Sequence, residues 1–163
     1  MTMSSITPRP YRSDDAPALL NLFRDTVRRV NSRDYSREQI AAWASDDIDP
    51  TAWAERFNGR YVVVAEADQQ PVGFAELVPD GHIDRVYVSA DWQSRGVGRQ
   101  MLAALIAEAH RLQIPRLSVE ASITARPFFE RLGFIVLAKQ FVTCRGVEFE
   151  NYRMELNCGE GRT

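Results

Sequence analysis

Two glycines and two arginines stand together between a strand-like and a helix-like stretch, in the segment Gln93-Ser94-Arg95-Gly96-Val97-Gly98-Arg99. Glycine at these positions permits positive φ angles and lets a ligand approach the backbone closely. Successive N–H groups at the positive end of a helix bind phosphate oxygens, and the arginines add positive charge. The segment therefore predicts an anion site suited to a pyrophosphate-like group. A short Gly-x-Gly after a strand can also serve only to turn the chain, and this alternative stays open.

The segment lacks the features of two other phosphate-binding loops. A Walker loop ends in Gly-Lys-Ser/Thr, whereas Gly98 is followed by Arg99 and Gln100. A dinucleotide fingerprint has a third glycine and lies in the first strand-to-helix turn of a parallel sheet, whereas this segment follows an antiparallel meander. Neither motif accounts for the segment.

His82 and Asp84 are candidates for acid–base chemistry in the stretch that leads to the glycine segment. Side chains two residues apart on a strand share a face, so the pair can act as a base and the group that orients it. A neutral imidazole accepts protons near neutral pH. Simpler interpretations also stand: His82 as a turn residue after Gly81, and Asp84 as the partner of an arginine. Glu76 is a weaker base candidate, or a carboxylate on a solvated face.

Hydrophobic periodicity predicts the elements that position these residues. A helix opens at Ser13, its expected N-cap, and ends near Val30, while Ser36 and Gln39 have the spacing of a capping box. Further helices are expected around 40–43, 51–57, 101–109 and 125–132, the last capped by Thr124. The expected strands are 8–12, 61–66, 72–78, 82–88, 116–121, 135–143 and 147–156. The pattern predicts an α+β fold in a single domain, 1–163, with a mixed, mostly antiparallel sheet of about seven strands flanked by about four helices.

Composition and charge argue against several classes of protein. The chain has 163 residues of ordinary globular composition, and its formal net charge of -2 argues against a nucleic-acid partner. No stretch approaches the roughly 18 apolar residues of a membrane span, and the N-terminal residues lack the pattern of a secretory signal. Cys144 and Cys158 lack metal-ligand or redox spacing. We therefore expect no metal site, and we expect the protein to be in the reducing cytoplasm.

Four segments in order, 83–88, 93–98, 125–134 and 152–156, carry a family resemblance. Segment 93–98 is similar to the Gln/Arg-x-x-Gly-x-Gly/Ala loop that binds acetyl-CoA in the GNAT N-acetyltransferases. Segment 83–88 resembles the strand before that loop, 125–134 the helix and turn after the fifth strand, and 152–156 the closing strand. The resemblance covers about residues 61–156, and the first sixty residues match only loosely.

The resemblance implies acetyl-CoA as cofactor, with its pyrophosphate on the backbone amides of Arg95 to Arg99. The pantetheine arm would lie where the fourth and fifth strands separate and would bind backbone atoms of Val86 and Val88. The N–H of Val88 would stabilise charge on the thioester oxygen. The implied cofactor-binding residues are Val86, Tyr87, Val88, Gln93, Ser94, Arg95, Gly96, Val97, Gly98, Arg99, Ser122 and Phe129.

Two of these residues depart from the family pattern. Phe129 stands where many members have a tyrosine that protonates the leaving thiolate, and Ser122 stands where many have an asparagine. Because phenylalanine has no proton to donate, the general acid would be Tyr87, Tyr152, water or none. His82 falls where several members carry a catalytic glutamate.

The implied function is acetyl-CoA-dependent N-acetyltransfer, in which a primary amine of a small molecule or peptide attacks the thioester directly. A CoA-binding sensor without acyl transfer is the alternative. Tyr35, in a polar stretch, is expected to touch the acceptor, and Trp43, Trp53 and Phe57 are expected to pack in the core. A monomer or a homodimer is expected, because the terminal hairpin offers a free edge for pairing.

Overall fold

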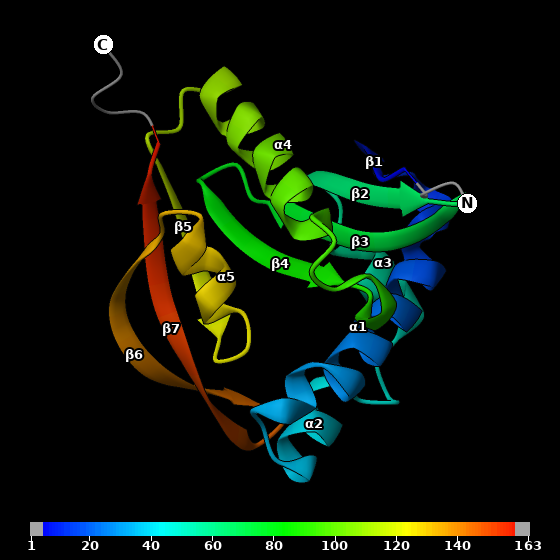
Figure 1. Ribbon diagram of the computed structural model, residues 1–163. Helices are drawn as coiled ribbons and strands as arrows, with labels where there is room; N and C mark the ends of the chain where they lie inside the picture. Colours follow the sequence, from blue (N-terminus) through cyan, green and yellow to red (C-terminus); the bar gives the residue numbers. More distant parts are fainter. Residues whose placement is uncertain (1–4, 159–163) are drawn as a thin grey trace.

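The computed structural model describes residues 5–158. They form five α-helices and one seven-stranded sheet with strand order β1-β2-β3-β4-β5-β7-β6 (Figure 1). The strands are β1 (Thr7–Pro10), β2 (Tyr61–Ala67), β3 (Gln70–Leu77), β4 (His82–Val88), β5 (Arg116–Ser122), β6 (Ile135–Cys144) and β7 (Val147–Asn157). The α-helices are α1 (Ala16–Arg29), α2 (Arg37–Trp43), α3 (Pro50–Glu55), α4 (Val97–Arg111) and α5 (Arg126–Arg131). Short 3-10 helices form η1 (Ser13–Asp15), η2 (Asn31–Arg33) and η3 (Ala90–Trp92).

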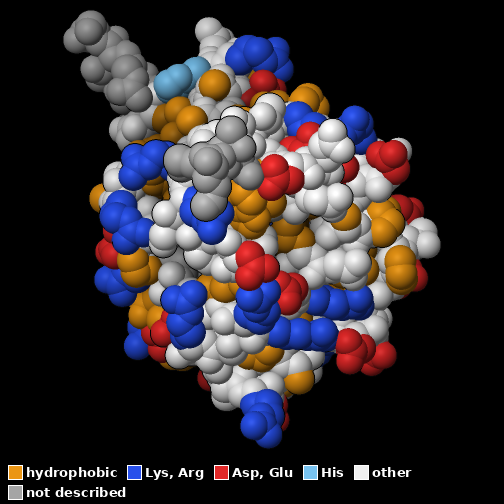
Figure 2. Space-filling view, turned by 45° about the vertical axis from the view of Figure 1, so that its right-hand side comes forward, with side chains coloured by type: hydrophobic (Ala, Val, Ile, Leu, Met, Phe, Trp, Pro, Cys, Tyr) orange, Lys and Arg blue, Asp and Glu red, His pale blue; other side chains and the backbone are white. Residues whose placement is uncertain are grey.

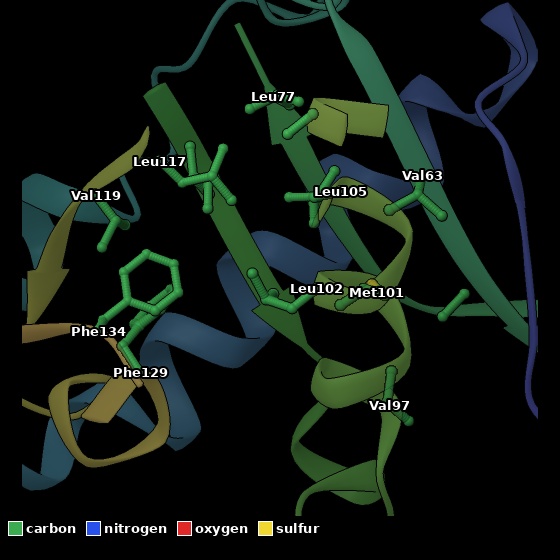
Figure 3. Close-up of a cluster of buried hydrophobic side chains, with 14 of the residues drawn as sticks. Val63, Leu77, Val97, Met101, Leu102, Leu105, Leu117, Val119, Phe129 and Phe134 are labelled. Atoms are coloured by element: carbon green, nitrogen blue, oxygen red, sulfur yellow. The ribbon is translucent and has the colours of Figure 1, made fainter. Parts of the chain in front are cut away.

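Helices cover both faces of the sheet. On one face, Leu102 and Leu105 of α4 and Phe129 of α5 belong to a buried cluster with Leu117 of β5 (Figure 3). On the other face, α1, α2 and α3 bury a second cluster against β2, β3 and β7, with members Leu19, Phe23, Ile40, Trp53, Val64, Phe74 and Phe149. The apolar face predicted for the helix around 101–109 is confirmed as the face of α4 that packs on the sheet.

The sheet opens at the pair β4 and β5, which are its only parallel neighbours in residues 5–158. Only His82↔Ser118 and Ile83↔Val119 are paired, and beyond them the two strands diverge (Figure 1). β5 then pairs along its whole length with β7. The sheet therefore consists of two halves, β1 to β4 and β5-β7-β6, that are joined at one end of β4.

A β-bulge accompanies this divergence. Ile83 pairs with Leu77 and Val86 with Ala75 on β3, so two residues of β4, Asp84 and Arg85, lie opposite one residue of β3. A bulge bends its strand and increases the local twist. The bend begins at the position where β4 leaves β5.

The predicted strands, the hairpins and the Ser36–Gln39 capping box are confirmed, but two helix caps were predicted wrongly. Ser13 makes no cap; instead the Asp15 carboxylate accepts the Arg12 N–H at 2.7 Å. Thr124 is not the cap of α5, because Ser122 Oγ accepts the Ala125 N–H at 3.0 Å. The five α-helices match the five helical ranges expected from the sequence, and α2 and α3 lie where helices around 40–43 and 51–57 were predicted.

The face in Figure 2 shows Lys and Arg side chains interspersed with Asp and Glu. Mixed charges of this kind give no extended region of one sign on that face. Within residues 5–158, the helices all fall short of the length and apolar character needed to cross a bilayer.

Candidate active site

A cavity of about 790 Å³ lies where β4 and β5 diverge. Its wall comes from α1, η2, α2, β4, the segment 92–99, β5, α5, β6 and β7. Elements that are far apart in the sequence therefore meet around one space, at the only place in the described sheet where neighbouring strands separate.

The glycine segment forms the turn into α4 and lines this cavity with Gln93, Ser94 and the residues from Gly96 to Arg99. Ser94 and Gly96 adopt left-handed φ angles of 62° and 86°. The first helical hydrogen bond runs from Gln100 N to Gly96 O at 3.0 Å. The N–H groups of Val97, Gly98 and Arg99 precede this bond and so have no partner within the helix. They lie at the positive end of a 15-residue helix, which is an arrangement that binds anions.

Glycine is favoured at the two positions of the segment for different structural reasons. A Cβ at Gly96 would have no atom within 4 Å, so glycine is favoured there by its φ of 86°. At Gly98, a Cβ would lie 2.9 Å from the ring of Phe128. Gly98 therefore permits the first turn of α4 to pack against α5, in addition to lining the cavity.

The arginines of the segment are arranged less uniformly than expected. Arg99 lines the cavity, whereas the guanidinium of Arg95 stacks on Trp92 at 4.7 Å and Arg95 is not part of the cavity wall. Gln93 acts through its side chain: Nε2 donates to Val88 O at 2.7 Å and fastens the loop to the end of β4. The backbone amides and Arg99 fit a diphosphate, and the role of Arg95 stays a prediction.

The backbone of β4 faces the cavity along its free edge. Ser89 N–H donates to Val72 O at 2.8 Å, and because backbone groups alternate along a strand, the N–H groups of Val86 and Val88 point away from β3. This is the side from which β5 has departed. Thr26 Oγ1, at 3.2 Å, and Gln93 both donate to Val88 O. A ligand along this edge would therefore find the N–H of Val88 rather than its carbonyl.

His82 and Asp84 have separate partners. His82 Nδ1 lies 2.9 Å from Ser118 Oγ, at the first of the two paired positions of β4 and β5, and His82 is not part of the cavity wall. Asp84 does line the cavity, but its carboxylate binds Arg56 at 2.8 Å and also Arg60. Burial raises the pKa of Asp84, and the two guanidinium groups outweigh that effect and hold it below its ordinary value. Asp84 is therefore a paired carboxylate, as the simpler interpretation expected, and does not orient His82.

Glu76 is a buried structural carboxylate and not a solvated one. It is 0% exposed and binds Arg60 at 3.0 Å and Arg85 Nε. Arg85, 6% exposed, lies over the rings of Trp53 at 4.3 Å and Phe57 at 4.9 Å. Two aromatic faces and one carboxylate thus compensate this buried cation. The expectation that Glu76 lies on a solvated face is wrong.

Part of the cavity wall is aromatic, with Tyr35, Trp43 and Phe149 all lining the cavity. Their ring centroids lie 5.4 to 5.9 Å apart in edge-to-face or tilted contacts. Tyr35 was expected at the acceptor and lies in this wall. Trp43 was expected in the core but also lies in this aromatic wall, whereas Trp53 and Phe57 are core residues as predicted.

Tyrosine hydroxyls around the cavity are engaged in hydrogen bonds. Tyr35 Oη donates to Glu150 O at 2.6 Å, and burial raises the pKa of Tyr35 to about 12. Tyr87 Oη accepts from Trp43 Nε1 at 3.1 Å, and burial raises the pKa of Tyr87 as well. Tyr152 Oη donates to Glu150 Oε2 at 2.6 Å, and Tyr152 is outside the cavity wall. Their raised pKa values make Tyr35 and Tyr87 weaker proton donors than a free tyrosine, and the general acid stays unassigned.

The aromatic wall is fastened to the tip of the β6-β7 hairpin. Two hydrogen bonds run to carbonyls of the hairpin, from Tyr35 Oη to Glu150 O at 2.6 Å and from Gln39 Nε2 to Glu148 O at 2.9 Å. A third runs from the hairpin to α2, from Arg145 Nη1 to Ala42 O at 2.7 Å. The two halves of the sheet are thus connected again at the end of the cavity opposite the β4–β5 pair.

Ser122 and Phe129 both line the cavity, as their assignment to cofactor binding requires. Ser122 Oγ accepts from Asn31 Nδ2 at 3.4 Å, which links β5 to η2. Phe129 is buried and contacts Phe128 and Phe134 in the core. Their contact with a cofactor stays a prediction.

Among the polar residues of the cavity wall that were not singled out from the sequence are Asn31, Arg33, Glu120 and Asn151. For Glu120, the alternation of buried and exposed residues along β5 was a signal in the sequence. In β5 the buried residues are Leu117, Val119 and Ala121, so Glu120 belongs to the opposite face. Asn31 and Arg33 lie in a polar stretch without periodicity, and their place follows only from the tertiary structure.

Comparison with known proteins agrees with this geometry. The family model described as "Acetyltransferase (GNAT) domain" matches residues 31–156. The uncharacterized N-acetyltransferase YafP of Escherichia coli K12 is 39% identical over 152 residues, which cover 93% of this chain and 96% of that protein. The crystal structure of a GCN5-related N-acetyltransferase from Rhodopseudomonas palustris superposes with a TM-score of 0.90 at 35% identity, covering 96% of this chain and 98% of the other.

A more distant structure shows the same fold. The PaiA N-acetyltransferase of Thermoplasma acidophilum, solved in complex with coenzyme A, has a TM-score of 0.75 at 18% identity and covers 94% of this chain and 99% of its own. Since the family model spans most of the chain and the E. coli relative nearly all of it, the chain belongs to the GNAT acetyltransferase family and is an acyltransferase that uses acetyl-CoA as its acyl donor.

Proposed function

We propose that this protein acetylates a primary amine of a small molecule or peptide, by direct attack of the amine nitrogen on the thioester of acetyl-CoA. The observation that carries the proposal is the divergence of β4 and β5, because it opens one cavity that reaches both the glycine segment and the aromatic wall. A donor and an acceptor bound at these two places share one space. Direct transfer needs no acyl-enzyme step.

The donor side consists mainly of backbone groups. The N–H groups of Val97, Gly98 and Arg99 would hold the diphosphate, and the N–H of Val86 would bind the extended arm. The N–H of Val88 would stabilise negative charge on the carbonyl oxygen. Preorganised dipoles of this kind are a large contribution to acyl-transfer catalysis.

His82 is the proposed proton acceptor. Ser118 Oγ engages Nδ1, and Nε2 has no hydrogen-bond partner in residues 5–158. Because His82 lies just outside the cavity wall, it would take the ammonium proton through a water molecule. The amine nitrogen then bonds to the acetyl carbon as the carbon–sulfur bond breaks and the sulfur keeps the electron pair, and the nitrogen gives its second proton to water to become the amide. Water protonates the thiolate, since Phe129 has no proton to give and a free thiol has a pKa near 8.5.

Two measurements test the proposal. Acetyl-CoA at 100 times its Kd should stabilise the fold by about 2.7 kcal/mol, seen as a rise of several degrees in Tm. A thiol assay with a panel of primary amines should then show release of free CoA that depends on the amine. No thermal shift at millimolar acetyl-CoA contradicts the proposed donor site.

The phenylalanine at position 129 favours a second candidate, a CoA-binding sensor without acyl transfer. Its buried ring contributes no acid to the cavity. The same pair of measurements separates the two functions, because a sensor would give the thermal shift without CoA release from any amine of the panel.

A further inference from the structure

Glu120 lies at the start of the opening between β4 and β5. The last residues paired across these strands are Ile83 and Val119, so Glu120 is the first residue of β5 beyond the pairing. It lines the cavity, and it lies on the face opposite to the buried Val119 and Ala121. That face looks toward η2 and α2, whereas the glycine segment and α4 lie on the other side.

Asp84 is the matching position on β4, and its charge is already compensated. Arg56 and Arg60 both bind its carboxylate. Glu120 has only the side-chain amide of Gln140, which donates to Oε2 at 2.9 Å. In residues 5–158 no cation lies within 4 Å of Glu120, and no hydrogen bond reaches its Oε1. Of the two carboxylates that flank the opening, Glu120 is therefore the one that lacks a counter-charge.

The charged groups around Glu120 do not neutralise its carboxylate. Arg153 of β7 is its register partner, and Arg33 of η2 also lines the cavity, but neither forms an ion pair with it. From β4, His82 is bonded to Ser118 and Asp84 to its two arginines. An exposed carboxylate oxygen at a cavity wall accepts strong hydrogen bonds from a cation.

An apolar surface lies on the same side of the cavity. Tyr35, Trp43 and Phe149 form the wall there, and their polar atoms are used within the protein: Tyr35 Oη by Glu150 O and Ile123 N, and Trp43 Nε1 by Tyr87 Oη. What these side chains offer to a ligand is therefore ring surface, which packs against an apolar body.

We infer that Glu120 binds the ammonium group of the acceptor, and that the acceptor is a primary alkylamine, cationic in solution, whose apolar body packs on Tyr35, Trp43 and Phe149. This inference rests on the proposed function, because it assigns the acceptor half of the same cavity. It adds no covalent step: Glu120 holds the ammonium by a charge-assisted hydrogen bond until the proton leaves.

Two probes of nearly equal shape isolate the charge. 2-Phenylethylamine is protonated at pH 7, whereas O-benzylhydroxylamine, in which an oxygen replaces the methylene next to nitrogen, is neutral. Isothermal titration of each probe into CoA-saturated protein compares the wild type with Glu120→Gln, which keeps the shape of the side chain and an oxygen for Gln140. Glu148→Gln is the matched control, because Glu148 is an exposed carboxylate of β7 outside the cavity wall.

The wild type should bind 2-phenylethylamine about 10-fold or more tightly than O-benzylhydroxylamine, since hydrogen bonds to charged groups are worth about 1.5–3 kcal/mol. Glu120→Gln should lose this preference by weakening the cationic probe alone, and Glu148→Gln should keep it. A wild type without the preference, or a Glu120→Gln protein that retains it, overturns the inference.

A CoA titration of all three proteins separates this inference from the proposed function. Equal CoA affinity in all of them shows that the variants are folded and that the donor site is intact, so a missing charge preference then counts against Glu120 alone. Failure of the wild type to bind CoA removes the proposed function, and the acceptor assignment with it.

Discussion

The proposed donor side and the proposed acceptor side of the cavity are built differently. On the donor side, consecutive residues of one turn, 93–99, and the free edge of one strand present backbone N–H groups. On the acceptor side, η2, α2, β5 and β7 each contribute one or two side chains. The first arrangement depends on local conformation and tolerates many side chains. The second depends on contacts between distant segments, so its chemistry changes with single substitutions.

Gly98→Trp should have the largest effect and should act on the donor side. A Cβ at this position already lies 2.9 Å from Phe128, so an indole must turn into the cavity and cover the amides of α4. We expect acetyl-CoA affinity to fall by at least about 100-fold, which corresponds to about 2.7 kcal/mol, in isothermal titration. Gly98→Ala is the graded control, and its smaller side chain should cost less affinity. Wild-type affinity in the tryptophan variant, with its fold checked by circular dichroism, would place the diphosphate elsewhere.

His82→Ala tests the junction of the two sides. General-base catalysis contributes about 100-fold or more, so kcat at neutral pH should fall by about that factor, with acetyl-CoA affinity retained. Ser118→Ala removes only the partner of Nδ1 and should lower kcat less. Steady-state kinetics with the best amine of the panel gives both values, and a fully active His82→Ala enzyme would transfer the base role to another group or to water.

Trp43→Ala should separate the two sides most clearly. It removes part of the aromatic wall and the hydrogen bond to Tyr87 Oη, and it leaves the turn 93–99 and the backbone edge of β4 in place. Loss of an aromatic contact worth about 1 kcal/mol should raise KM for the amine by about 5-fold, while KM for acetyl-CoA stays unchanged. A parallel rise in both KM values would mean that the two sides are not independent.

Asp84→Asn should have the smallest effect, on stability as a function of pH. The pKa of Asp84 is lowered in the folded protein by Arg60 and Arg56, so its contribution is present above the unfolded pKa near 3.9 and is lost as pH falls through the folded pKa. Because the pair is partly exposed, we expect about 1 kcal/mol. Urea unfolding from pH 6 down to pH 3 should show a shallower loss of stability in Asp84→Asn than in the wild type. Equal slopes would contradict the ion pairing of Asp84.

The difference between local conformation and long-range contacts also explains what the sequence could predict. The turn 93–99 and the strand His82–Val88 were placed correctly because backbone conformation and hydrophobic alternation act over a few residues. The partners of Asp84 were not, because Arg56 and Arg60 reach it from 24 to 28 residues away. Glu120 had a local signal in the alternation of β5, but its importance follows from the charges around it, which only the folded chain shows.

The N-terminus of α5 shows that tertiary contacts also decide details over a few residues. Ser122 and Thr124 are both hydroxyl residues just before α5, and propensity does not choose between them. The tertiary position of Ser122, bonded to Asn31 across the cavity, makes it the one that accepts the Ala125 N–H. The N-cap of α5 is Ala125, which has no side-chain cap of its own, so the hydroxyl cap predicted at Thr124 is absent and a hydroxyl two residues earlier binds the Ala125 N–H instead.

The connection of α2 to the hairpin tip has a consequence for how such a protein diversifies. Gln39 Nε2 donates to Glu148 O of the hairpin, and Arg145 Nη1 of the hairpin donates to Ala42 O of α2. Because these bonds hold α2 in place, replacing Trp43, its cavity-lining residue, alters the opening without disturbing the β4–β5 junction. Under the proposed function, substitutions at this one position of a seven-residue helix would change which acceptors fit, while the backbone groups proposed to bind the donor stay the same.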